Sequence, residues 1–178
     1  MYNKKQFIEK LIEFIKSDKK IALIRGYVNE EKLKYVLSVL NHSEYNKGNI
    51  QTRSIGQLKD IVDNRIVPKN IKQNANYQVE NLTLQVNLYE RSSISTGDFS
   101  IYYPVQSALM NEKDTQKLLN HINENYTDKI FIITTNDWSF TTEKIENIVD
   151  EIITLDLKQI DKEKFNILYN NKKGDLPY

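Results

Sequence analysis

The chain has 178 residues, of which 39% are hydrophobic and 28% charged, and this balance is typical of one globular domain of about 100–200 residues. The absence of cysteine excludes disulfides and thiolate metal sites, and two histidines, His42 and His121, are too few for a typical histidine-based zinc site. No segment reaches the roughly 18 apolar residues of a membrane span, and the N-terminus lacks the pattern of a secretory signal. We therefore expect a cytoplasmic protein without a structural metal and without a membrane partner.

The net charge is only +1, but it is unevenly distributed along the chain. Basic residues are in excess over residues 1–35 and 46–73, whereas acidic residues dominate 137–163. This asymmetry would suit an anionic partner at one end. Surface charge of this kind is more often an ordinary solvated face, which is the simpler interpretation.

The first forty residues predict a helix, a strand, a turn and a second helix. Apolar residues at helical spacing within 1–18 predict an amphipathic N-terminal helix. The unbroken apolar run 21–24 is typical of a strand that is buried on both faces. A turn over 25–29 follows, and Asn29 is a plausible N-cap for a helix over 30–40.

The middle of the chain predicts two strands that are separated by a long polar loop. A strand is expected over 49–55, followed by a short helix over 57–62. The polar, asparagine-rich stretch 63–78 is expected to be a loop. Residues 82–88 alternate with period two, as a half-buried strand does.

The second half predicts alternating strands and helices. Residues 99–105 are aromatic and β-branched and end near Pro104, and 130–133 form the clearest buried strand. The remaining elements are expected to be a helix, a helix capped by Thr141 or Thr142, a strand and a short helix, over residues 111–123, 141–148, 152–155 and 165–169.

Strands that alternate with helices predict a three-layer αβα fold with a mainly parallel sheet. We expect a single domain over 1–178, with a core over 20–160 and a short C-terminal tail over 161–178. The apolar strands near 21–25, 99–104, 130–134 and 152–155 are expected to be central, because parallel strands are buried on both faces.

The turn after the first strand carries a damaged phosphate-binding motif. The segment GYVNEEKL, from Gly26 to Leu33, fits the frame G-x-x-x-x-G-K-[ST] of P-loop NTPases. Gly26 and Lys32 match that frame, but Glu31 replaces the second glycine and Leu33 replaces the hydroxyl that binds Mg²⁺. A loop of this sequence should hold a triphosphate poorly, because Glu31 adds negative charge to a site for anions.

Later elements resemble, in order and spacing, the core of the AAA-type ATPases over residues 20–160. Tyr103 and Pro104 stand where the resemblance places the acidic Walker B pair, and Asn136 stands where it places a polar sensor residue. Residues 149–157 resemble the strand that leads into the helical lid of that family. The resemblance implies a degenerate P-loop NTPase with eroded Walker A and Walker B motifs.

Each of the residues named has a structural interpretation beside the functional one. Lys32 could bind phosphate, but a lysine in the first turns of a surface helix is usually solvated. Gly26 could simply serve a tight turn, and Asn136 could be a turn former. Trp138 is the best aromatic candidate for a contact with a ligand or protein, although it could equally cover the edge of the core.

The favoured hypothesis is a non-catalytic P-loop-like binding or regulatory domain, a pseudo-ATPase, within a DNA-handling or mobile-element system. Inactive subunits of clamp loaders offer the analogy. We expect no cofactor, although weak nucleotide binding stays open. One alternative is a metal-dependent nuclease or other phosphodiester hydrolase that uses acidic residues near strand ends, such as Asp98, Asp137 and Asp156. Another is a nucleic-acid-binding module that uses the basic segments.

The predicted site lies at the exits of strands 21–25 and 130–134. The carboxyl ends of parallel strands share one edge of the sheet, where such folds bind their ligands. The residues expected there are Arg25, Gly26, Lys32, Asn136, Asp137 and Trp138. They predict a locally basic surface with an aromatic anchor, which suits a protein partner or a nucleic-acid end.

Overall fold

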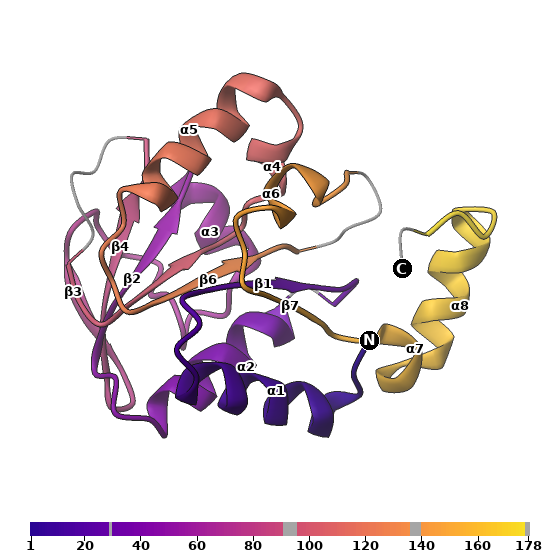
Figure 1. Cartoon of the computed structure of the whole chain (residues 1–178), viewed down its shortest axis with the longest axis horizontal. Helices are drawn as coiled ribbons and strands as arrows, with labels where there is room; N and C mark the ends of the chain where they lie inside the picture. The colour runs from indigo at the N-terminus through magenta and orange to yellow at the C-terminus, as the bar shows by residue number, and fades with distance from the viewer. Residues whose placement is uncertain (29, 91–95, 136–139, 177–178) are drawn as a thin grey trace.

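The computed structural model describes residues 1–28, 30–90, 96–135 and 140–176, and its core is a seven-stranded sheet (Figure 1). The strand order is β3-β4-β2-β5-β6-β1-β7; β3 pairs antiparallel with β4, and all other neighbours pair in parallel. The strands are β1 (Ile21–Arg25), β2 (Lys47–Thr52), β3 (Asn76–Val79), β4 (Leu82–Leu88), β5 (Phe99–Tyr102), β6 (Lys129–Ile133) and β7 (Glu151–Thr154).

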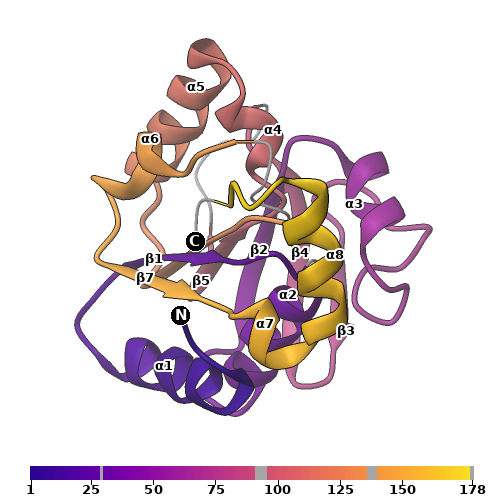
Figure 2. The ribbon, with the colours of Figure 1, turned by 90° about the vertical axis from the view of Figure 1, so that its right-hand side faces the viewer.

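Helices cover both faces of this sheet, and two more follow β7. One core cluster contains side chains of α1, α2 and α3, and a second contains those of α4, α5 and α6. Figure 2 shows the two layers on opposite sides of the sheet, with α7 and α8 beyond the end of β7. The helices are α1 (Lys4–Lys16), α2 (Glu30–Asn41), α3 (Ile55–Ile61), α4 (Gln106–Leu109), α5 (Glu112–Asn123), α6 (Glu143–Glu146), α7 (Leu157–Ile160) and α8 (Lys162–Asn171). The predicted αβα architecture with a mainly parallel sheet is confirmed.

The middle of the sheet is formed by the most apolar runs of the sequence. In β6 every residue is buried, and Ala22, Leu23 and Ile24 of β1 are fully buried. β1 pairs with β6 on one side and β7 on the other, so that Ile24 lies opposite both Ile133 and Ile153. Burial on both faces explains why these strands read as continuous apolar runs.

Several predicted elements are wrong in place or extent. Residues 76–79, at the end of the predicted loop, form β3, because the two-residue turn at Glu80 and Asn81 lets this segment pair with β4. β7 lies at an edge of the sheet and not in its middle, although a bridge from Tyr2 to Leu155 extends pairing there.

Two helical predictions also need correction, and two short helices were not predicted. α6 ends at Glu146, and Thr142 at its N-cap makes no capping hydrogen bond with its side chain. α4 and α7, each of four residues, had no detectable periodicity in the sequence. The expected short tail contains α8, which is longer than predicted.

A hydrogen-bonded cluster ties α5 to the sheet. The Tyr102 hydroxyl lies 2.7 Å from Nδ1 of His121 and accepts a hydrogen bond from the Asn125 amide at 3.0 Å. Burial lowers the pKa of His121, so the folded protein favours the neutral imidazole.

Acidification should therefore destabilise the protein through His121. The stability that depends on the neutral imidazole is complete above the unfolded pKa of about 6.5 and is lost as the pH falls toward the lower folded pKa. Urea unfolding at several pH values should show that His121→Gln loses this component, so that wild type and variant converge on acidification. A constant difference between the two proteins across that range would contradict the assignment.

Candidate functional site

The predicted site lies where the carboxyl ends of β1, β6 and β7 meet, as expected from their parallel pairing. Arg25 ends β1, Gly26 follows it directly, and Lys32 lies near the start of α2. The other predicted residues, Asn136, Asp137 and Trp138, lie outside the described residues. The structure therefore brings Arg25, Gly26 and Lys32 together with Thr134 and Thr135, which follow β6.

Lys32 is fully buried, and its side-chain nitrogen is surrounded by hydrogen-bond acceptors. Nζ donates to the carbonyl of Gly26, to the carbonyl of Thr135 at 2.9 Å and to the hydroxyl of Thr134 at 3.4 Å. Its exposed fraction is 0%. An ammonium group has three N–H donors, which matches these three acceptors. The expectation of a solvated surface lysine is therefore wrong.

The backbone groups that converge near Gly26 are carbonyls, whereas a phosphate requires N–H donors. A phosphate site needs backbone N–H groups that converge on the anion. Here the carbonyls of Gly26 and Thr135 converge on the Lys32 nitrogen. Gly26 has a φ of +128°, and a Cβ at this position would collide with the Leu155 carbonyl, so glycine is required by the packing against β7. The structural interpretation of Gly26 as a turn residue accounts for this position.

Arg25 is likewise engaged by neighbouring side chains. Its Nη1 lies 2.6 Å from a carboxylate oxygen of Glu146 and 2.9 Å from the hydroxyl of Thr142, and its Nε donates to Thr154 at 3.1 Å. The Arg25 side chain is 20% exposed. Because Glu146 balances Arg25 and Lys32 is buried, these two residues do not make the edge basic, contrary to the prediction.

A second charged cluster lies at the carboxyl ends of β2 and β4, where the sequence analysis had named no residue. Arg53 follows β2 and donates to Asp114 at 2.6 Å, while Glu90, beyond β4, lies 3.5 Å from Arg53 and 3.7 Å from Lys117. A hydrogen bond from Asn111 lowers the pKa of Asp114, and Arg53 adds to the effect. Two cations and two carboxylates here leave the cluster neutral.

Buried tyrosine adjoins this second cluster. Burial raises the pKa of Tyr89 to about 12, so the phenol stays protonated at neutral pH. Its ring lies 6.3 Å from that of Tyr102 and 6.2 Å from that of His121, between centroids. The Tyr89 ring therefore belongs to the core beneath α5.

The acidic residues of the nuclease hypothesis do not assemble. Asp98 precedes β5, at the amino edge of the sheet, and accepts hydrogen bonds from the backbone N–H groups of Asn46 and Lys47. Asp156 follows β7, at the opposite edge, and caps α7. Asp137 lies outside the described residues. Within the part of the chain that the structure describes, no group of three histidine or acidic residues could hold a metal ion.

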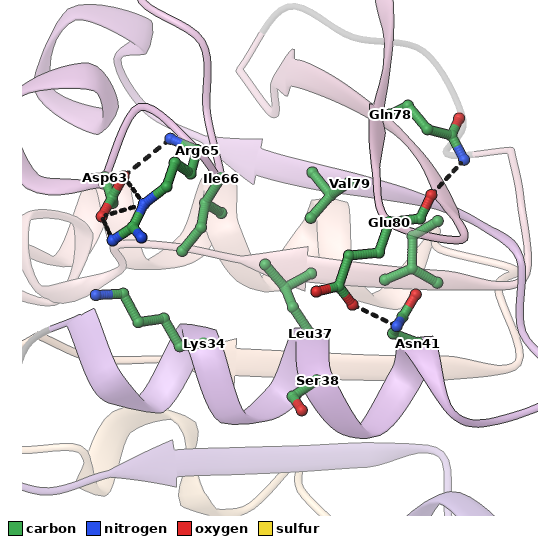
Figure 3. A pocket seen from close by; sticks show the side chains of 11 residues that line it. Lys34, Leu37, Ser38, Asn41, Asp63, Arg65, Ile66, Gln78, Val79 and Glu80 are labelled. Carbon is green, nitrogen blue, oxygen red and sulfur yellow. Dashed lines mark hydrogen bonds and ion pairs between the residues drawn. The ribbon is translucent and has the colours of Figure 1, made fainter.

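A groove of about 490 Å³ runs along α2, between that helix, the segment 63–66 and the β3–β4 hairpin (Figure 3). Leu37, Ile66 and Val79 make its apolar floor. One end carries the Asp63–Arg65 ion pair, whose oxygen and nitrogen lie 2.6 Å apart, and the other carries Glu80, which is hydrogen-bonded to Asn41. The polar side chains at both ends of the groove therefore bond to each other, and we interpret them as the rim of the packed β3–β4 hairpin.

No helix of the described segments is both long enough and apolar enough to cross a bilayer. No protein-family model, curated protein or solved structure matches the chain. The functional conclusion therefore depends on the geometry of the chain itself.

The buried position of Lys32 predicts a large effect on stability. Lys32→Ala should lower the free energy of unfolding by about 2–4 kcal/mol, because it leaves buried carbonyls without donors and opens a cavity. Denaturant unfolding measures this change. Lys113→Ala, on the exposed side of α5, is the matched control and should cost less than about 0.5 kcal/mol. If the two variants are equally stable, Lys32 has no structural role of this kind.

Proposed function

We propose that the chain is a non-catalytic, P-loop-like binding domain that recognises a protein partner at the carboxyl edge of its sheet. The observation that carries this proposal is the burial of Lys32. A phosphate-binding lysine must reach the ligand, whereas this one donates to the carbonyls of Gly26 and Thr135. The donors of Lys32 are thus used by the protein's own carbonyls and are not offered to a ligand.

The positions of the elements support the P-loop-like part of the proposal. β1, which precedes the degenerate loop, lies inside the sheet. β6, the strand before the position that resembles the sensor residue, lies directly beside it. Lys32 bridges the exits of both strands. Tyr103 is fully buried, so the position that resembles Walker B contributes to the core and not to a metal site.

The balance of charges at this edge favours a protein over a nucleic acid as the partner. Nucleic-acid binding depends on cations that are free to contact phosphates. Arg25 pairs with Glu146, and Arg53 pairs with Asp114 and Glu90. Paired charges beside the half-buried aromatic side chain of Tyr27 resemble the composition of protein interfaces. The inactive clamp-loader subunits remain the analogy for such a role.

Purified protein should neither hydrolyse ATP or GTP nor bind them saturably with Mg²⁺. The physical reason is that the loop presents carbonyl oxygens where the triphosphate needs donors. Phosphate release and calorimetric titration are the measurements. Turnover above background that disappears in a folded Lys32→Met variant would refute the non-catalytic assignment.

The partner-binding edge can be tested with a matched pair of tyrosine variants. Tyr27 follows β1 at the carboxyl edge, whereas Tyr126 precedes β6 at the opposite edge and is 75% exposed. In affinity capture followed by binding assays with the purified partner, Tyr27→Ala should weaken binding at least tenfold, as a central interface aromatic does. Tyr126→Ala should bind as the wild type does. The reverse ranking, with both variants folded, would place the interface elsewhere.

A further inference from the structure

One face of the sheet carries a continuous array of polar side chains over β2, β3 and β4. Alternate residues of a strand point to the same face. On the face away from α1 and α2, these strands present only polar side chains, namely Lys47, Asn49, Gln51, Asn76, Gln78, Thr83, Gln85 and Asn87. Most are carboxamides, which offer both a donor and acceptors.

The strand register aligns these side chains in rows. Asn76 lies opposite Gln85, which lies opposite Asn49 on β2. The neighbouring row contains Gln78, Thr83 and Lys47. These rows of polar side chains cross three strands and are spaced by the strand separation of about 4.8 Å.

Part of the array is buried, including Gln51 at 0% exposure, and part of it is open to solvent. The exposed fraction rises from β2 toward the edge strand β3. Asn49 on β2 is 1% exposed, whereas Asn76 and Gln78 on β3 are exposed. The array contains a hollow of about 380 Å³, a size within the range of binding pockets.

The hydrogen bonds around this hollow leave acceptors available. Gln85 donates to Asn76 at 2.7 Å, Asn87 donates to Asn49 at 3.0 Å, and Asn49 donates to the carbonyl of Thr96 at 2.6 Å. Asn76 and Gln85 line the hollow and are open to solvent at least in part, so the amide N–H and C=O groups that this pair leaves unused can bond to a ligand.

The charge of the lining favours an anionic ligand. Among the described residues that line the hollow, Lys47 is the one that carries a charge, and Asn49, Asn76, Thr83 and Gln85 are neutral. We propose that this hollow binds an extended acidic peptide segment of a partner protein. The peptide N–H and C=O groups would pair with the carboxamides, and a glutamate or aspartate would pair with Lys47.

A single-stranded nucleic acid fits the same surface less well. Such ligands need aromatic side chains for base stacking and several cations along the backbone. The described residues of the lining include one cation, Lys47, and no aromatic side chain. The proposed peptide site is distinct from the carboxyl-edge interface and does not depend on the function proposed above.

The test uses ¹⁵N-labelled full-length protein and a capped hexapeptide of alternating asparagine and glutamate at low salt. Backbone amide shifts should change at residues 47–49, 83–85 and 96–97, with saturation. The matched peptide of alternating asparagine and lysine should bind at least fivefold more weakly. Lys47→Glu should weaken the acidic peptide at least fivefold, and Lys72→Glu, an exposed lysine outside the hollow, should leave binding unchanged. Lys47→Gln repeats the test if the charge reversal fails to fold.

Several outcomes would overturn this proposal. They are the absence of shifts with the acidic peptide at millimolar concentration, equal binding of the two peptides, and equal weakening by Lys47→Glu and Lys72→Glu. Saturable shifts at the hollow with a thymidine oligonucleotide, stronger than with the acidic peptide, would replace the peptide by a nucleic acid.

Discussion

The hydrogen bonds of Lys32 are the constraint on which the carboxyl edge of the sheet depends. Lys32 lies near the start of α2, and its Nζ donates to the carbonyl of Gly26, which follows β1, and to that of Thr135, which follows β6. One side chain thus fixes a helix and the ends of two strands. A buried lysine is stable only when its donors are satisfied, which makes this arrangement sensitive to any loss of an acceptor. At the opposite edge, Lys129 connects the start of β6 to the end of α1, because its Nζ donates to the carbonyls of Phe14 at 3.2 Å and Ser17 at 2.5 Å.

This constraint supports the proposal of a binding surface that carries out no phosphate chemistry. In a working phosphate loop the lysine and the backbone N–H groups face the ligand. Here the lysine faces inward, Gly26 packs against the Leu155 carbonyl, and Arg25 is paired with Glu146. The described residues that remain at this edge include the Arg25–Glu146 pair and the half-buried Tyr27, and this mixture supports the proposed protein partner. The polar array over β2, β3 and β4 offers a different chemistry, that of hydrogen bonds to an extended chain.

The sequence predicted those features that depend on local pattern. Apolar runs identified β1 and β6, and the period of two identified β4, because burial on one or both faces leaves a direct trace in composition. β3 was missed because it has only four residues within an asparagine-rich stretch, and its pairing with β4 sets its structure. The burial of Lys32 could not be read from the chain, since Thr135 lies 103 residues away. The array has a readable signal, the alternate polar residues of residues 47–51 and 83–87, which gain meaning only once the register is known.

The most direct test of the account is the chemical reactivity of Lys32 in the folded protein. Amine labelling under native conditions, followed by mass spectrometry, reports which lysine nitrogens can be reached. Lys32, with an exposed fraction of 0%, should stay unlabelled while the exposed Lys113 reacts quickly, and added Mg²⁺–ATP should change neither rate. If Lys32 is labelled as fast as Lys113, or is protected only when nucleotide is added, the lysine faces a ligand site and the domain binds nucleotide after all.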